Sequence, residues 1–198
     1  MRFNFERLLP CRSILSKHLL IDALAHNKDL HCFLEVSTAL VYKSASKKGG
    51  HKEDDAVEPW TVQAKYKREA EIALLELRER ASLPLVIVRP ALVYGPSDTS
   101  ALMPRIATAA VYKETKATMM LLWDASMKLN TVHVADVCRA IWFLSWGKAI
   151  EAGARPQGDR LPIYNLADKS DSDQGSVNKY VSIFVRQDAA ATFSSPVR

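Results

Sequence analysis

The hydrophobic and polar positions of this chain follow two patterns that alternate along its length. Short apolar runs typical of buried strands lie at residues 31–36, 85–90, 129–134 and 162–166. Apolar positions with helical spacing predict helices at residues 13–27, 59–80, 101–113, 135–146 and 176–187. Strands that alternate with helices predict an α/β fold with a parallel sheet and right-handed crossovers. We therefore expect Val36, Val88 and Val132 on adjacent or near-adjacent parallel strands, and Asp136 and Ser176 as caps of their helices.

The first predicted strand ends at two hydroxyl residues, Ser37 and Thr38, within the stretch 36–42. Ligands of open α/β sheets bind at the carboxyl ends of parallel strands, so this stretch predicts one side of a binding site. The same two hydroxyl groups are also suited to capping backbone groups of a buried strand, without any ligand. The stretch alone leaves both interpretations open.

The composition limits the class of protein. A chain of 198 residues, 48% hydrophobic and 25% charged, can bury a core and predicts one domain with at most a small appendage. Cys11, Cys32 and Cys138 are odd in number and scattered, so they predict no disulfide framework and a reducing compartment, with the cytoplasm as the default. The histidines lack metal-ligand spacing and no apolar run has the length of a membrane span, so we expect neither a metal nor a membrane.

The net charge of +5 raises the question of nucleic-acid binding. The densest group of lysines lies in residues 43–52, among Ser, Gly and His and without the aromatic side chains that stack on bases. Acidic residues follow directly at 53–55. We therefore expect a solvated loop at this place and no nucleic-acid partner.

Five short motifs occur in a fixed order along the chain. They are Ser37-Thr38-Ala39-Leu40-Val41-Tyr42, Pro59 with Lys67 and Glu71, Arg89-Pro90-Ala91-Leu92-Val93-Tyr94-Gly95-Pro96, Val132-His133-Val134-Ala135-Asp136-Val137, and Tyr164-Asn165-Leu166. Together they resemble the extended short-chain dehydrogenase/reductase family, in its NAD-dependent epimerase/dehydratase branch. The resemblance runs from about residue 14 to residue 187 and begins partway into the family's domain. It implies an N-terminally truncated member with an incomplete Rossmann-like, doubly wound parallel sheet and flanking helices, which lacks the first strands and the Gly-rich loop.

The resemblance implies roles for single residues near the first predicted strand. Thr38 matches the family's catalytic Ser/Thr, whose hydroxyl group binds the substrate oxygen. The spacing from Pro59 and from Glu71 puts Lys67 at the position of the family's catalytic lysine and Gln63 at that of its catalytic tyrosine. A glutamine side chain does not ionise, so the family's usual acid/base group is absent at that position.

Two tyrosines come into question as substitutes for the missing one. Tyr66 lies one turn along from Gln63 and is a low-ranking substitute that needs a shifted helix. A second register, with Lys65 at the lysine position and Thr61 at the tyrosine position, also lacks a tyrosine. Tyr112 and Lys116 spell Tyr-x-x-x-Lys, but they follow the third motif, where the family has its substrate-side segment, so we interpret this pair as a coincidence. The alternative for Lys67 and its basic neighbours is a charged helix face without a catalytic role.

The resemblance also implies NAD or NADP as the cofactor. The family holds the pyrophosphate on a Gly-x-x-Gly-x-x-Gly turn at a helix N-terminus. None of the seven glycines of this chain forms such a turn. Contacts with the cofactor are therefore expected at its nicotinamide end only, and the residues implied there are Ser37, Thr38, Lys67, Pro90 and Val93.

Two functional hypotheses follow from these observations. The first is an NAD(P)-dependent oxidoreductase, epimerase or dehydratase that acts on a small hydroxyl- or carbonyl-bearing substrate and is impaired by the truncation and the missing tyrosine. The alternative is a non-catalytic relic of the same fold that binds a metabolite or a partner. The sheet edge left by the missing strands predicts a homo-oligomer or a partner that adds a strand. By domain, we expect an N-terminal extension at 1–12, a partial NAD(P)-binding domain at 13–187 with its substrate-side portion at about 97–187, and a flexible tail at 188–198.

Overall fold

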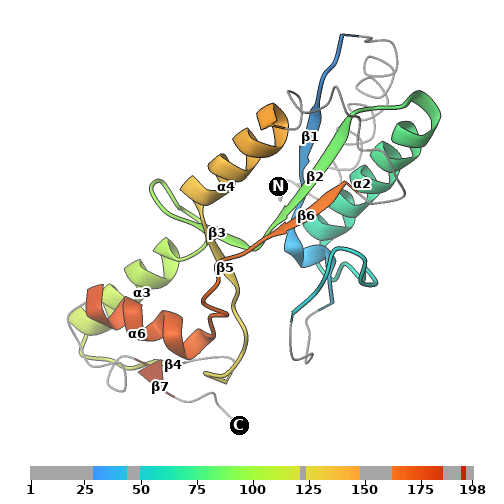
Figure 1. Ribbon diagram of the computed structural model, residues 1–198. Helices are drawn as coiled ribbons and strands as arrows, with labels where there is room; N and C mark the ends of the chain where they lie inside the picture. Colours follow the sequence, from blue (N-terminus) through green and yellow to red (C-terminus); the bar gives the residue numbers. More distant parts are fainter. Residues whose placement is uncertain (1–28, 44–49, 121–123, 148–161, 185–192, 195–198) are drawn as a thin grey trace, which may run out of the picture. The chain divides into compact units, whose positions relative to one another are not determined.

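The structure is a computed structural model of the chain and describes residues 29–43, 50–120, 124–147, 162–184 and 193–194 (Figure 1). The predicted extension at 1–12 and the predicted helix at 13–27 lie outside these residues. The chain divides into two compact units, Met1–Pro90 with Arg139–Asn165 and Ala91–Cys138 with Leu166–Arg198. Both combine parallel strands with helices, which confirms the predicted α/β class.

The first unit is built on a three-stranded sheet in the order β1-β2-β6. Strand β1 (Phe33–Val36) is parallel to β2 (Leu85–Pro90), and Val36 is the partner of Val88 in the register. Strand β6 (Ile163–Leu166) adds to the other edge of β2. All six residues of β2 are buried, which agrees with its apolar, β-branched sequence and its central place. The expected pairing of Val36 with Val88 is therefore confirmed.

Helix α2 (Val62–Ala81) connects β1 to β2, after a single 3-10 turn, η2 (Ala39–Val41). One stripe of α2 is buried and packs with the sheet; the resulting core cluster consists of Leu74, Leu77, Leu83, Leu85, Ile87 and Ile163. The helix begins later than the predicted start at residue 59, because the Thr61 side chain accepts a hydrogen bond from Ala64 N at 3.1 Å and so caps the first turn. Ser82 ends it in the left-handed conformation, with φ of 53°.

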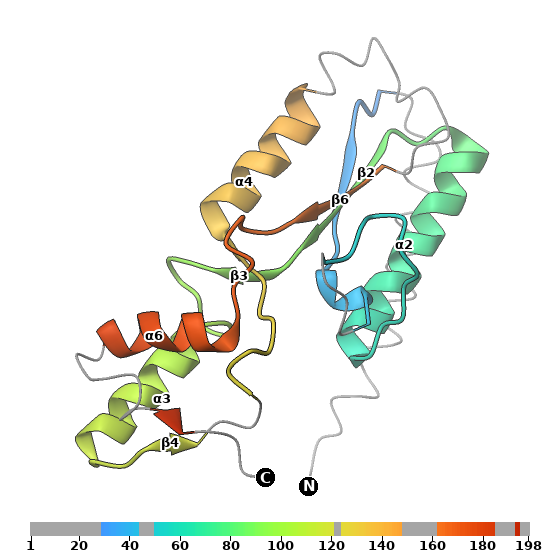
Figure 2. The same cartoon turned by 60° about the horizontal axis from the view of Figure 1, so that its bottom comes forward.

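The second unit contains a two-stranded parallel sheet and a pair of packed helices. Strand β3 (Leu92–Tyr94) pairs with β5 (Thr131–His133). Helices α3 (Met103–Glu114) and α6 (Gln174–Phe184) lie side by side in both views (Figures 1 and 2) and bury Ala109, Val177 and Val181 between them. A short parallel pair, β4 (Met119–Met120) and β7 (Phe193–Ser194), completes the strands of the described residues.

The expected place of Val132 was wrong. Val132 pairs with Val93 of β3, in a sheet separate from the one that holds Val36 and Val88. The chain leaves the larger sheet at Pro90 and starts a new ladder two residues later, where Leu92 N donates to Asn130 O at 3.1 Å. The sequence predicted the end of the strand at Pro90 correctly, and Ala91 N still donates to Leu166 O at 2.8 Å before the new ladder begins.

Two expected helix caps fall within the described residues. Helix α6 starts at Gln174, earlier than expected, and the cap is Asp173, whose Oδ1 accepts hydrogen bonds from Ser176 N at 2.7 Å and Ser176 Oγ at 2.8 Å. The role expected for Ser176 was therefore wrong. Helix α4 (Val134–Trp142) carries Asp136 in its first turn, and it continues as a single π-helical stretch, η3 (Phe143–Gly147). His133 Nδ1 accepts from Ala135 N at 3.2 Å in this turn, and the cap expected from Asp136 stays a prediction.

Two further observations concern membranes and metals. Within the part of the chain that the structure describes, no helix combines the length and the apolar character needed to cross a membrane. In the same ranges, no group of three or more His, Cys, Asp or Glu side chains is arranged to hold a metal ion.

Candidate active site

The carboxyl end of β1 carries the two hydroxyl residues singled out in the sequence. Ser37 N donates to Val88 O at 2.8 Å and extends the ladder by one residue, and the Ser37 side chain is buried. Thr38 is extended, with φ of −154°, and its Oγ1 accepts from Leu40 N at 3.2 Å as the cap of η2. Thr38 Oγ1 therefore has a fixed position while its proton stays available for donation to a ligand oxygen.

Lys67 brings an ammonium group to this strand end from α2. Its Nζ donates to Val36 O at 2.6 Å and to Glu35 Oε1 at 3.0 Å. The Lys67 side chain is 39% exposed and that of Glu35 is 20% exposed, so the ion pair is partly shielded from water. Because Thr38 follows Val36 by two residues, the structure brings the lysine and the hydroxyl residue expected from the motifs to the same end of β1.

The position of the expected tyrosine contains no acid/base group. Gln63 is exposed on the first turn of α2, one turn before Lys67. Tyr66, the low-ranking substitute, is half-buried on the same helix. Tyr112 and Lys116 do not form a helical pair, because α3 ends at Glu114 and Lys116 has φ of 53°. This agrees with the interpretation of that pair as a coincidence.

A buried ion pair lies one turn beyond Lys67. Arg89 of β2 donates from Nε to Glu71 Oε1 at 2.9 Å and from Nη2 to Glu71 Oε2 at 2.7 Å, and both side chains are at most 1% exposed. Arg68 Nη1 adds a third hydrogen bond to Glu71 Oε2 at 3.0 Å. Burial alone would raise the pKa of Glu71, but hydrogen bonds from Arg89 and Ser37 and the positive charge of Arg89 outweigh it and leave the pKa below its ordinary value.

The Ser37 side chain is buried at the end of β1, and within the described residues its Oγ has no hydrogen-bond partner. The cofactor contact that the resemblance implies for Ser37 stays a prediction.

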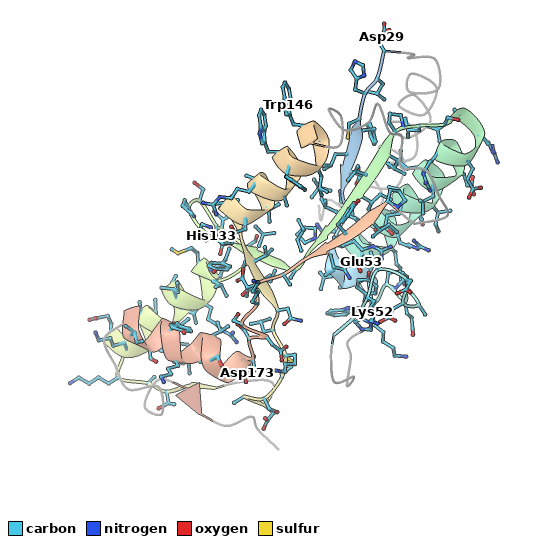
Figure 3. The ribbon with its side chains drawn as sticks, in the orientation of Figure 1. Asp29, Lys52, Glu53, His133, Trp146 and Asp173 are labelled. Carbon is cyan, nitrogen blue, oxygen red and sulfur yellow. The ribbon has the colours of Figure 1, made fainter. Side chains whose placement is uncertain are left out.

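A stacked and hydrogen-bonded cluster fixes the loop after η2. The Tyr42 ring stacks on His51 with centroids 4.8 Å apart, and Tyr42 Oη accepts from Arg89 Nη1 at 2.6 Å and donates to Asn165 Oδ1 at 2.9 Å. The Glu53 carboxylate (Figure 3) accepts from Asn165 N at 2.9 Å. These contacts join β2, β6 and the loop, so the backbone around Thr38 is held from several sides.

Two of these residues were missed as site residues at the sequence level. Glu35 interrupts an apolar strand run, and an acid placed there indicates a cation nearby, which is the available clue that was not used. Arg89 was noted only as part of a motif, although an arginine inside a buried strand requires an acidic partner. The partner is Glu71, which in the sequence served only to place Lys67 at the position of the family's catalytic lysine.

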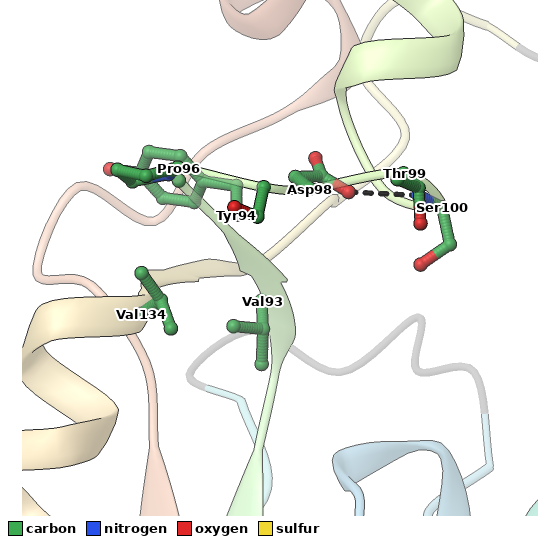
Figure 4. A pocket seen from close by; sticks show the side chains of 9 residues that line it. Val93, Tyr94, Pro96, Asp98, Thr99, Ser100 and Val134 are labelled. Atoms are coloured by element: carbon green, nitrogen blue, oxygen red, sulfur yellow. Dashed lines mark hydrogen bonds between the residues drawn. The ribbon is translucent and has the colours of Figure 1, made fainter.

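The second unit has a hollow of its own, with a volume of about 240 Å³ (Figure 4). Its lining consists of Val93, Tyr94, Gly95, Pro96, Ser97, Asp98, Thr99, Ser100 and Val134. Val93, expected at the nicotinamide end of a cofactor, thus lies in this unit on β3, whereas Pro90 is the buried last residue of β2 in the first unit.

Backbone geometry shapes this hollow. Asp98 Oδ1 accepts from Ser100 N at 2.9 Å and Ala101 N at 2.7 Å, and its Oδ2 accepts from Leu102 N at 2.7 Å and Met103 N at 3.2 Å. The bond from Ala101 and the others lower the pKa of Asp98 to about 2. The carboxylate therefore satisfies the N–H groups that start α3, where the Leu102 side chain offers no cap.

Tyr94 is the titratable residue of the hollow with a raised pKa. Burial is the main cause, and the negative charges of Asp168 and Asp136 add to it. Its ring meets His133 edge to face, with centroids 5.2 Å apart. Tyr94 stays neutral near pH 7 and can donate a hydrogen bond, but it is not suited to act as a base.

The fit to a nicotinamide dinucleotide covers one end of that molecule. At the carboxyl end of β1 the Thr38 hydroxyl group and the Lys67 ammonium group match a ligand rich in hydroxyl and carbonyl oxygens. The 198-residue sequence has no Gly-x-x-Gly-x-x-Gly turn for the pyrophosphate. These residues therefore fit the nicotinamide and its ribose only.

In open α/β folds ligands bind at the carboxyl ends of the parallel strands, and Thr38 and Lys67 lie at such an end. Residues 13–166 match the NAD dependent epimerase/dehydratase family, and the chain belongs to that family. Among curated proteins, none matches the sequence.

Solved structures of similar fold are epimerases and dehydratases. UDP-glucuronic acid 4-epimerase from Bacillus cereus in complex with NAD aligns with a TM-score of 0.70 at 20% identity, over 93% of this chain and 56% of that one. UDP-glucose 4-epimerase from Thermus thermophilus in complex with NAD gives 0.69 at 18%, over 92% and 56%. dTDP-glucose 4,6-dehydratase from Bacillus anthracis in complex with NAD gives 0.68 at 19%, over 93% and 55%. The chain spans a little over half the length of these proteins, and identities this low support a shared fold alone.

Proposed function

We propose that this chain is part of an NAD-dependent epimerase or dehydratase that acts on a hydroxyl- or carbonyl-bearing sugar of the nucleotide-sugar class. Family membership supports the reaction class, and the substrates named for the similar structures, UDP-sugars among them, support the substrate class. NADP in place of NAD, and a cytoplasmic location, stay predictions.

The observation that carries the proposal is that Lys67 Nζ binds Val36 O, two residues before Thr38, at the carboxyl end of β1. In the proposed site, Thr38 Oγ1 donates its proton to the reacting oxygen of the substrate, while Lys67 Nζ holds a hydroxyl oxygen next to it. NAD, when bound, supplies the hydride acceptor and donor. Gln63 can orient a hydroxyl group by hydrogen bonding but cannot exchange a proton, so proton transfer is expected to be the weakened step.

Saturation-transfer NMR with NAD⁺ at millimolar concentration tests the proposal. A millimolar dissociation constant corresponds to about −4 kcal/mol, within the reach of a few hydrogen bonds. We expect saturation of the nicotinamide and adjoining ribose protons and much less of the adenine protons. Lys67→Met should abolish it, whereas Lys65→Met, which removes an exposed lysine from the same helix, should not. If the nicotinamide protons receive no saturation, the proposal is wrong.

A second function from a different class is favoured by the exposed Gln63, since that position holds no acid/base group. We propose as the alternative a non-catalytic relic of the fold that binds a metabolite or a strand-adding partner. The two functions differ in the fate of substrate. Transfer of a hydride from a bound sugar nucleotide to NAD⁺, seen as NADH fluorescence at millimolar concentrations of both, is expected only for the epimerase or dehydratase, and its absence together with saturable sugar-nucleotide binding would favour the relic.

A further inference from the structure

The acidic residue beside Lys67 has no assigned role in the motifs of the sequence. Glu35 lies on β1, and its Oε1 accepts from Lys67 Nζ at 3.0 Å. We propose that Glu35 is the positioning residue of Lys67: it fixes the ammonium group at the carboxyl end of β1 and cancels its charge, so that this site selects an uncharged hydroxyl or carbonyl oxygen and rejects a phosphate. The inference rests on the proposed function and adds the residue that sets the ligand chemistry of that site.

The number of hydrogen-bond donors on Lys67 supports the inference that Glu35 fixes the position of its ammonium group. A lysine ammonium group has three N–H donors on a long flexible stem. Two of them are used, toward Glu35 Oε1 at 3.0 Å and toward Val36 O at 2.6 Å. Two anchors from consecutive residues of a strand fix both the place and the direction of the group. Among the described residues, this leaves one N–H for a ligand, and the other two set its direction.

The burial of the two side chains supports the inference that Glu35 cancels the charge of Lys67. The Glu35 and Lys67 side chains are 20% and 39% exposed, whereas in the surface pair of Lys43 and Glu58 both are more than 60% exposed. Water and salt therefore screen the Glu35 charge less than they screen that of Glu58. An anion that approaches Lys67 meets a carboxylate within hydrogen-bond distance of the same nitrogen, and the net attraction is small. A neutral oxygen meets no such opposition.

Acylation of lysines by an N-hydroxysuccinimide ester, followed by mass spectrometry of the peptides, measures how firmly each amine is held. Glu35→Gln should raise the acylation rate of Lys67 at least about threefold, the change expected when a partly shielded ion pair is lost. Glu35→Asp keeps the charge on a shorter stem and should give an intermediate rate. Glu58→Gln is the matched control, and it should change the rate of Lys43 by less than about twofold, as for exposed pairs.

The second measurement concerns the charge of the ligand. Inorganic pyrophosphate should protect Lys67 from acylation in Glu35→Gln but not in the unchanged chain, because only the variant presents an uncompensated ammonium group. Equal protection in both chains would overturn the proposal, and so would a Lys67 rate that is the same in all Glu35 variants.

If Glu35→Gln does not fold, Glu35→Asp and the effect of salt on the unchanged chain decide. Rising salt should speed the acylation of Lys67, and no effect of salt would overturn the proposal.

These measurements do not depend on NAD. If Lys67 responds to Glu35 as expected but NAD⁺ shows no contact by NMR, the proposed function fails and the role of Glu35 stands. If NAD⁺ contacts the chain through Lys67 but the acylation rate of Lys67 does not depend on Glu35, the proposed function stands and the role of Glu35 is wrong.

Discussion

At the scale of single residues, the ion pair between Glu71 and Arg89 is the contact whose loss should cost most. Both side chains are buried, and removal of one partner leaves a charge without compensation in the core. We expect Glu71→Ala to lower the free energy of unfolding by about 3–5 kcal/mol, measured by urea denaturation.

Glu76→Ala is the matched control for this prediction. Glu76 pairs with Arg80 on the same helix at 3.8 Å, but both side chains are more than half exposed. Its loss should cost about 0.5 kcal/mol or less. Equal costs for the two variants would contradict the view that Glu71 and Arg89 form a structural ion pair that is well shielded from water.

Asp98 gives a prediction that depends on pH. Its pKa in the folded chain is about 2, below the ordinary 3.8, because four backbone N–H groups point at its oxygens. A lowered pKa means that the charged form stabilises the fold above pH 3.8 and that this contribution is lost as the pH falls toward 2. In Asp98→Asn, the melting temperature should therefore fall less steeply between pH 5 and pH 2 than in the unchanged chain. Parallel curves would show that Asp98 does not hold these N–H groups.

The site residues could be predicted from the sequence only where a motif fixed their spacing. Thr38 and Lys67 reach the same strand end, as their motifs implied. Glu35 belongs to no motif, and its contact with Lys67 depends on how far a helix lies from a strand, which spacing along the chain does not reveal. Ser37 shows the opposite case, because its position in a motif did not indicate that its hydroxyl group would be buried without a hydrogen-bond partner among the described residues.

At the scale of helices and strands, patterns of apolar residues predicted the elements, and local hydrogen bonds set their ends. The strand predicted at 85–90 is confirmed in full, since its apolar run coincides with complete burial. Helix α2 starts at Val62 and not at Pro59, because the Thr61 side chain caps its first turn. Helix α6 starts at Gln174, because the Asp173 carboxylate accepts from Ser176. Several residues near each end are able to cap a helix, and apolar spacing does not choose among them.

Gly95, directly after β3, offers a test at this scale. Its φ is 138°, which other residues rarely adopt, and a Cβ atom there would lie 2.7 Å from Val134 Cγ1. Gly95→Ala should therefore destabilise the chain by about 2–5 kcal/mol, from backbone strain and from crowding together. Thermal unfolding measures the loss, and Val134→Ala in the same chain should restore only the part due to crowding.

Gly50→Ala serves as the control for Gly95. Gly50 also has a positive φ, of 72°, but nothing lies within 4 Å of its added Cβ. Gly50→Ala should therefore lower the free energy of unfolding only through backbone strain, by about 1–2 kcal/mol. If Gly50→Ala cost as much as Gly95→Ala, contact with Val134 would not be the cause.

At the scale of the whole molecule, the order of strands and helices gave the α/β class, but not the division into units. Val132 was expected on a parallel strand adjacent or nearly adjacent to those of Val36 and Val88, and it lies in the second unit on a strand that pairs with β3. A short strand has the same apolar pattern whichever of the two sheets it joins, so the pattern does not tell which sheet that is. Strand β2 ends at Pro90 and β3 begins at Leu92, and the apolar pattern shows where the first run ends but not which strand the next one pairs with.

The last prediction concerns the chemistry of the 198-residue chain by itself. Holding the nicotinamide at attack distance is worth roughly 7–11 kcal/mol of barrier, whereas one acid/base group contributes about 10²–10⁴ in rate. The sequence has no Gly-x-x-Gly-x-x-Gly turn to hold the pyrophosphate, so this loss should outweigh that of the tyrosine at Gln63. We expect calorimetry to show no micromolar binding of NAD(H) or NADP(H), and Gln63→Tyr alone to produce no turnover. Micromolar binding by the unchanged chain would contradict this prediction and would mean that another segment or a partner chain holds the pyrophosphate.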